Sequence, residues 1–161
     1  MAVDYFLKID GIPGESLDHK HKDEIEVHSW SWGENQTGTM SSGGGGGAGK
    51  VNMQDFHFVM KVNKATPKLV LACASGEHIK KAVLTCRKAG KDQQEYLKWT
   101  FTDLLVSSYQ TGGKAAADVV PVDEVSINFT EIQVDYKEQK ADGTLGGAIT
   151  TKYNLKTQSS A

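Results

Sequence analysis

Apolar and polar residues alternate along most of the chain, and this alternation predicts a protein built mainly of β-strands. Successive side chains of a strand point to opposite faces, so a half-buried strand shows a period of two residues. The alternating segments are also rich in β-branched and aromatic residues, which strands favour. They are Val3–Ile9, Ile25–Trp32, Phe56–Val62, Ala82–Lys88, Glu95–Phe101, Leu104–Tyr109, Val125–Tyr136 and Ile149–Leu155.

The segment Val125–Tyr136 changes the phase of its alternation part-way. Its apolar residues occupy odd-numbered positions up to Phe129 and even-numbered positions from Ile132 onward. A shift of one residue turns the side chains of a strand over to the other face. We therefore predict a β-bulge, or a bend between two sheets, near Thr130 and Glu131.

Closely spaced aromatic residues indicate which strand faces are buried. Trp30 and Trp32 lie two residues apart and share one face, so Ser29 and Ser31 lie on the other. Large aromatic side chains favour the core, and the serine face is then expected to point to solvent or to a lumen. Stacking on sugars or bases is the less favoured interpretation of these rings. The residues assigned to the core in this way are Trp30, Trp32, Phe56 and Phe58.

One short helix is predicted at about Thr66–Ser75. Thr66 is a suitable N-cap, Pro67 fits the first helical position, and Gly76 supplies the stop. Leu69, Val70 and Cys73 are expected to form its buried face. Without an alternating pattern of strands and helices, the fold is a mostly antiparallel barrel or sandwich of seven or eight strands, and 161 residues form one domain over 1–161.

A glycine-rich segment interrupts the strand pattern, and it predicts an extended loop. It carries no side chains for a core and has high conformational entropy. Gly44 and the pair Gly49-Lys50 also match most of a phosphate-binding P-loop, but Val51 stands where a hydroxyl is needed and strand periodicity follows. A nucleotide site is therefore disfavoured. The segment consists of Gly43, Gly44, Gly45, Gly46, Gly47, Ala48, Gly49 and Lys50.

Charge and composition exclude several functional classes. The net charge of −2 lacks the basic excess that phosphate contacts require, so we expect no nucleic-acid partner. Neither a signal peptide nor a run of about 20 apolar residues is present, so we expect no membrane insertion. Cys73 and Cys86 are expected to remain reduced thiols. These features favour a protein made in the cytosol.

Candidate catalytic and metal-binding residues are scattered. His19 and His21 lie in the mixed-charge run Asp18–Glu24 and are expected to be exposed loop residues rather than metal ligands. The chain carries no nucleophile elbow and no His-Glu-x-x-His motif. We expect no catalytic residues, no cofactor and no metal.

Three segments carry a resemblance to a known family. They are Glu24–Val27 leading to Trp30–Gly33, the loop Gly43–Asn52, and Gln133–Tyr136 leading to Lys140–Gly143. Together they resemble the haemolysin-coregulated protein (Hcp) family. The resemblance implies a compact two-sheet β-barrel with a flanking helix, forming hexameric rings that stack into the inner tube of a type VI secretion system. It also implies partners: a contractile sheath, a valine-glycine-repeat spike protein and small effectors in the lumen.

Two residue groups acquire roles from this resemblance. The loop Gly43–Lys50 is predicted to contribute to ring stacking, and Ser29 and Ser31 are predicted to face the channel. The protein would leave the cytoplasm through the type VI system without a signal peptide. A monomeric ligand-binding β-barrel is the alternative, and a nucleotide-binding protein is a third, less favoured possibility. The residues Lys114–Asp118 and Leu145–Ala161 match no feature of the family, and the resemblance assigns them no role.

Overall fold

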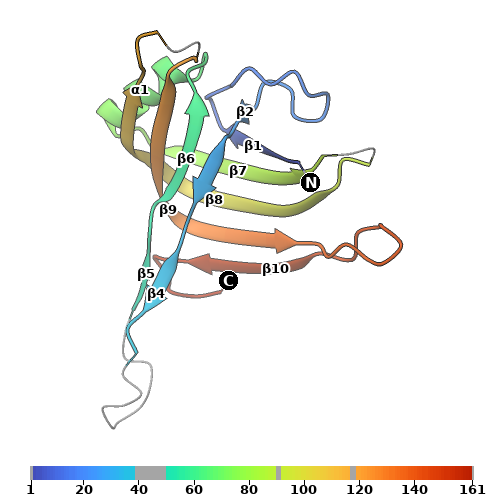
Figure 1. Ribbon diagram of the computed structural model, residues 1–161. Coiled ribbons are helices and arrows are strands. Elements are labelled where there is room, and N and C mark those ends of the chain that lie inside the picture. Colours follow the sequence, from blue (N-terminus) through green and yellow to red (C-terminus); the bar gives the residue numbers. More distant parts are fainter. Residues whose placement is uncertain (1, 39–49, 90–91, 117–118, 161) are drawn as a thin grey trace.

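A computed structural model describes residues 2–38, 50–89, 92–116 and 119–160 of the chain. They form one curled antiparallel sheet of eight strands, a two-stranded ribbon that leads away from it, and one helix (Figure 1). The predicted mainly β fold with one short helix is confirmed. The elements are β1 (Val3–Ile9), β2 (Ile25–Glu26), β3 (Ser29–Ser31), β4 (Glu34–Gln36), β5 (Val51–Met53), β6 (Phe56–Lys61), α1 (Thr66–Ser75), β7 (Ile79–Lys88), β8 (Glu95–Gly112), β9 (Val122–Tyr136) and β10 (Ile149–Asn154).

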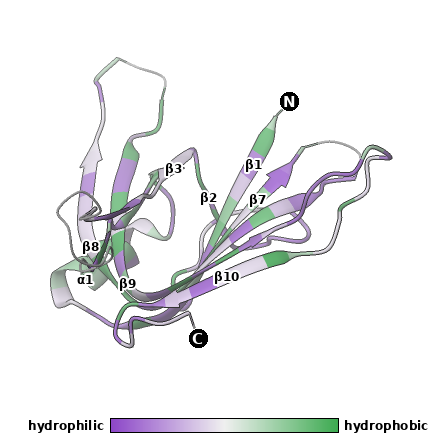
Figure 2. Ribbon diagram, turned by 90° about the horizontal axis from the view of Figure 1, so that it is seen from below, coloured by the Kyte–Doolittle hydropathy of each residue, from purple (hydrophilic) through white to green (hydrophobic). Residues whose placement is uncertain are grey.

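The strands of the curled sheet follow the order β2-β1-β7-β8-β9-β6-β3, and β10 pairs with the second half of β9. Apolar and polar residues alternate along these strands (Figure 2), so one face of each strand can be buried and the other solvated. The two segments Glu95–Phe101 and Leu104–Tyr109 belong to the single long strand β8.

One segment joins the two ends of the curled sheet by changing its partner. The amide of Val27 donates to the carbonyl of Tyr5 in β1 at 3.0 Å, and the amide of His28 donates to the carbonyl of Val59 in β6 at 2.8 Å. The prediction of one strand over Ile25–Trp32 is therefore wrong. Consecutive residues bond to opposite ends of the sheet, and this splits the segment into β2 and β3.

The long strands β8 and β9 bend at the same place. Along β9 the buried positions change phase between Phe129 and Ile132, as the sequence predicts. In β8, Asp103 has a φ of 52°, in the left-handed region that non-glycine residues rarely occupy. Its carboxylate accepts a hydrogen bond from the Thr130 hydroxyl at 3.0 Å. Before the bend β9 pairs with β6, and after it with β10.

The core fills the interior of the curled sheet with aromatic and aliphatic side chains. The ring of Phe101 lies at its centre, 4.7 Å from the ring centre of Phe56 and 4.9 Å from that of Phe129. Such separations are typical of favourable aromatic pairs. Other fully buried side chains include Phe58, Met60, Leu84, Leu7 and Ile127.

The helix α1 has the predicted bounds but a different N-terminus. The N-cap residue is Ala65, and it makes no side-chain cap. The hydroxyl of Thr66, predicted to be the cap, instead donates to the buried carboxylate of Asp123 at 2.6 Å. Leu69 is buried, whereas Val70 is exposed, so the predicted buried face is only partly correct. Gly76 ends the helix in the left-handed conformation, as predicted.

Candidate assembly surfaces

Strand β3 presents two short polar side chains on the side away from the core. Ser29 and Ser31 are exposed and stand opposite Val59 and His57. The imidazole Nδ1 of His57 is hydrogen-bonded to the hydroxyl of Ser126 at 3.0 Å. A lumen requires neighbouring chains, so the placement of the two serines in a channel stays a prediction.

The four aromatic residues assigned to the core differ in burial. Phe56 and Phe58 are fully buried, whereas Trp30 and Trp32 are half-buried and pack against the core from its margin. The indole N–H of Trp32 donates to the carbonyl of Gln54 at 2.9 Å. Trp32 thus lies where the β4–β5 ribbon leaves the barrel.

Strand β10 is an edge strand within the described part of the chain, where it pairs with β9 alone. Ile149, at its start, stands opposite Tyr136, and these residues are 70% and 45% exposed. An open strand edge offers backbone hydrogen-bonding groups to another chain. An exposed apolar pair beside such an edge is typical of an interaction surface.

The N-terminal loop, residues 13–24, folds back onto the outer face of the sheet. The amide of Gly14 donates to the carbonyl of Asp23 at 2.8 Å, and the amide of Ser16 donates to the carbonyl of Glu24 at 3.0 Å. A Cβ atom on Gly14 would lie 2.5 Å from the Glu24 carbonyl oxygen, so glycine is needed for this close approach. The loop is therefore a compact, internally bonded unit.

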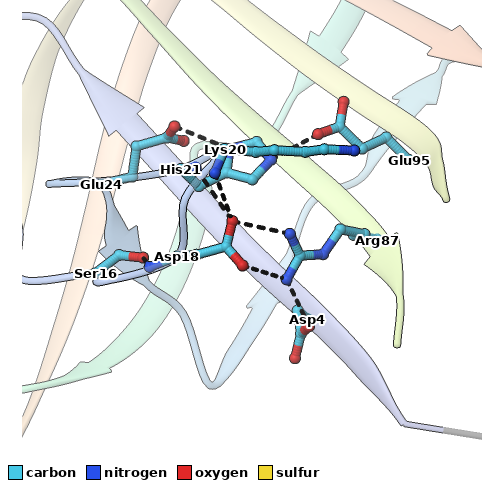
Figure 3. A network of polar contacts seen from close by, with 8 residues as sticks. All are labelled: Asp4, Ser16, Asp18, Lys20, His21, Glu24, Arg87 and Glu95. Carbon is cyan, nitrogen blue, oxygen red and sulfur yellow. Dashed lines mark hydrogen bonds and ion pairs between the residues drawn. The ribbon is translucent and has the colours of Figure 1, made fainter. Parts of the chain in front are cut away.

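A buried arginine fastens this loop to the sheet (Figure 3). Arg87 of β7 is 3% exposed, and its guanidinium donates to both carboxylate oxygens of Asp18, at 3.0 and 2.8 Å. It also donates to Asp4 of β1 at 3.1 Å. The hydrogen bond from Arg87 holds the pKa of the Asp18 carboxyl well below its usual range. Paired, hydrogen-bonded geometry of this kind is what makes a buried charge tolerable.

A histidine forms the second attachment of the loop. His21 is buried, and its Nδ1 and Nε2 atoms lie 2.8 Å from a carboxylate oxygen of Glu24 and 2.6 Å from one of Glu95. Its ring stacks on Phe6, with centroids 4.6 Å apart. The prediction that His21 is exposed is wrong. One of the residues that cover it, Glu95, comes from β8 and is far away in the sequence, so the local pattern could not indicate the burial. The participation of Arg87, Glu95 and Phe6 in this network has no local signal in the sequence.

The ribbon of β4 and β5 carries the glycine-rich segment. Glu34 pairs with Met53, and Gln36 pairs with Val51. Gly43–Gly49, predicted to contribute to ring stacking, lie outside the described residues. Lys50 is exposed and is followed directly by strand β5. A P-loop lysine is followed by a helix, so the strand at this position is inconsistent with a nucleotide site.

Comparisons with known proteins identify the family. Residues 6–136 match the family model described as "Type VI secretion system effector, Hcp". The chain is 50% identical over 158 residues to protein hcp1 of Pseudomonas aeruginosa, and the match covers 97% of both chains. The chain belongs to the Hcp family.

Solved Hcp structures share this fold over the whole chain. The crystal structure of Hcp1 from Salmonella typhimurium matches with a TM-score of 0.82 and 38% identity, covering 100% of both chains. The structure of another type six secretion system protein matches with a TM-score of 0.92 and 31% identity, over 98% of this chain and 99% of the other. The Hcp match over 6–136 includes the N-terminal loop and its partners Arg87 and Glu95, whereas Asp4 and β10 lie outside it.

Two further observations concern the described ranges alone. No group of three or more histidine, cysteine, aspartate or glutamate side chains there is arranged to hold a metal ion. No helix within those ranges is long and apolar enough to span a bilayer.

The thiol of Cys86 is buried, which raises its pKa to about 12 and keeps it protonated.

Proposed function

We propose that this Hcp-family chain is the structural subunit of a type VI secretion tube and has no catalytic role. Six copies close into a ring, and rings stack into an inner tube that a contractile sheath expels with a valine-glycine-repeat spike protein at its tip. The observation that carries the proposal is the match to Hcp proteins over the whole chain length. The open edge of β10 and the exposed Tyr136–Ile149 pair support it, because ring closure requires surface that a neighbour can cover.

The polar face of β3, β6 and β9 supports the placement of Ser29 and Ser31 toward the channel. The carboxylate of Asp55 on this part of the sheet accepts hydrogen bonds from Ser107 at 2.6 Å and from Asn128 at 2.9 Å. Its charge is thereby partly satisfied within the chain. Hydroxyl and amide groups, together with the exposed Lys61 and Glu124 on the same face, would offer polar contacts to small effector proteins.

The ribbon supports a role of Gly43–Lys50 in ring-on-ring contact. It leads away from the barrel (Figure 1), so the segment that joins its two strands could reach another ring. Deletion of Gly43–Gly49 should leave single rings intact and abolish tubes in negative-stain images. Tubes of normal length from the deleted chain would contradict this role.

The solution mass of the purified protein tests the central proposal. Six chains of 17.5 kDa make about 105 kDa (6 × 17.5), and images of the same peak should show rings with an open centre. A monomer at all concentrations would contradict the tube subunit. The alternative, a monomeric ligand-binding barrel, would then be favoured.

A further inference from the structure

Both ring nitrogens of His21 face carboxylates. Nδ1 lies 2.8 Å from an oxygen of Glu24, and Nε2 lies 2.6 Å from an oxygen of Glu95 (Figure 3). An ionised carboxylate only accepts hydrogen bonds, and a neutral imidazole has a single N–H group. A neutral ring therefore satisfies one of these carboxylates and points a lone pair at the other. Both contacts are hydrogen bonds when the cluster takes up one further proton, which imidazole, as the stronger base, holds.

The surroundings of His21 favour this additional proton. The charged groups gathered around it are Asp18, Lys20 and Glu24 of the loop, Asp4 of β1, Arg87 of β7 and Glu95 of β8 (Figure 3). Carboxylates outnumber cations in this group, so a positive ring lowers the repulsion between them. The ring also stacks on Phe6 with centroids 4.6 Å apart, and the face of an aromatic ring attracts a cation.

The two attachments of the loop respond differently to pH. Arg87 keeps its charge at every pH at which the protein is folded, so the end of the loop at Asp18 is held throughout. A histidine without partners loses its second ring proton near pH 6.5. The backbone near His21 has few other attachments, such as the hydrogen bond from the Asp23 amide to the Ser16 carbonyl at 2.9 Å. The end of the loop at His21 is therefore the one that pH can change.

We propose that His21 is a proton-dependent latch, which holds residues 19–24 against β8 while both ring nitrogens carry protons and releases them when one proton is lost. The docked ring is bound by two carboxylates and the released ring by none, so protons favour the docked loop. The attachment is complete where glutamate is ionised and imidazole is protonated, and these groups titrate near pH 4.3 and pH 6.5 in free chains. Its strength falls as the pH rises beyond that window. Release also exposes part of the Phe6 ring, which is 4% exposed in the docked state.

Hydrogen exchange of the full chain between pH 6 and pH 9 tests the latch. After correction for the pH dependence of chemical exchange, the protection of amides in residues 19–24 should fall as the pH rises. The fall should reach at most about tenfold per pH unit, because opening releases one proton. The amides of β7 are the internal reference and should keep their protection. Constant protection of residues 19–24 over this range would overturn the proposal.

Two substitutions assign the effect to the ring of His21. Glu95→Gln replaces an acceptor with an amide, which can donate to an unprotonated ring nitrogen, so the loop should stay protected while the pH dependence is lost. His19→Gln is the matched control, because it removes an exposed histidine two residues away in the same loop, and it should leave the pH dependence unchanged. A pH dependence that persists in Glu95→Gln, or that disappears in His19→Gln, would overturn the proposal.

Nuclear magnetic resonance of histidine labelled with ¹⁵N in the ring reads the protonation directly. As the pH rises, the ring signals of His19 should change before those of His21, since only the second ring lies between two carboxylates. The His19→Gln variant identifies the signals of His19 by their loss. Simultaneous change of both rings, or an earlier change of His21, would contradict the latch even if the loop were observed to loosen.

Discussion

Two polar segments extend from the barrel, the N-terminal loop and the β4–β5 ribbon, and these two excursions are built in opposite ways. The N-terminal loop returns to the sheet and is held by Arg87 of β7 and by Glu95 of β8. The β4–β5 ribbon leads away, and its two strands are joined at the base by the hydrogen bond from the Gln54 amide to the Gly33 carbonyl at 2.9 Å. One excursion is fastened by distant residues and the other by its own pairing.

The difference shows that local composition does not decide how firmly a segment is held. The run Asp18–Glu24 has the composition of a solvated loop, yet Asp18 and His21 are anchored in a charge network. A charged residue becomes an anchor when the fold supplies a partner with its own hydrogen bonds. Arg87 and Glu95 supply such partners, and the ribbon has no comparable buried charge among its described residues.

The largest effect is expected on removing the buried cation. Arg87→Ala should lower the free energy of unfolding by about 3–5 kcal/mol, because Asp18 loses its main partner and Asp4 loses its ion pair. Urea unfolding of the wild type and the variant measures this. Lys8→Ala, at an exposed position of β1, is the control and should change stability by less than about 0.5 kcal/mol. A similar small change for both would mean that the network does not hold the loop.

A glycine pair compares the two excursions directly. Gly14→Ala should cost about 1–3 kcal/mol, because the new Cβ lies 2.5 Å from the Glu24 carbonyl oxygen and the loop must shift. Gly38→Ala, beyond β4, should cost less than about 0.5 kcal/mol, because nothing lies within 4 Å of the new Cβ. Thermal melts of both variants test the pair. Equal costs would contradict the distinction between a packed loop and an open ribbon.

Acid should loosen the loop through Asp18. Its pKa is lowered in the folded chain by the Arg87 hydrogen bond, so its stabilising contribution is present above the unfolded pKa of about 3.9 and is lost as the pH falls toward the folded value. The variant Asp18→Asn should therefore be less stable than the wild type at pH 7, and the gap should narrow below about pH 4. Unfolding curves between pH 7 and pH 2 measure this. A stability difference between the wild type and Asp18→Asn that stays the same from pH 7 to pH 2 would indicate that the charge of Asp18 does not stabilise the fold.

The smallest effect is expected at the base of the ribbon. Trp32→Phe removes the indole hydrogen bond to Gln54 and should cost about 0.5–1 kcal/mol. Hydrogen exchange should show faster exchange in β4 and β5 and unchanged exchange in the N-terminal loop. Faster exchange in both regions would mean that the two excursions are coupled.

Features with local signals could be predicted from the sequence. The helix over Thr66–Ser75 is marked by Pro67 and Gly76, and the bend of β9 is marked by the change of phase after Phe129. These signals are local because a period or a stop depends on neighbouring residues. The Hcp family was also identified from the sequence, since its motifs are short and occur in order.

Features set by distant partners could not be predicted. The split of Ile25–Trp32 depends on Tyr5 in β1 and Val59 in β6, which lie near opposite ends of the sheet. The hydroxyl of Thr66 bonds to Asp123 rather than capping the helix, because β9 brings a buried carboxylate next to it. The burial of His21 depends likewise on Glu95.

The pairing of the N-terminal strand has a consequence for synthesis. Val3 in β1 pairs with Lys88 in β7, so the first strand has only the two-residue β2 beside it until the ribosome has made more than half of the chain. At about 5–20 residues per second, this delay is on the order of ten seconds. Throughout it, β1 can contact only β2 and the N-terminal loop, and the nascent chain offers a largely apolar strand to chaperones. The barrel can close only after β7 has emerged from the ribosome.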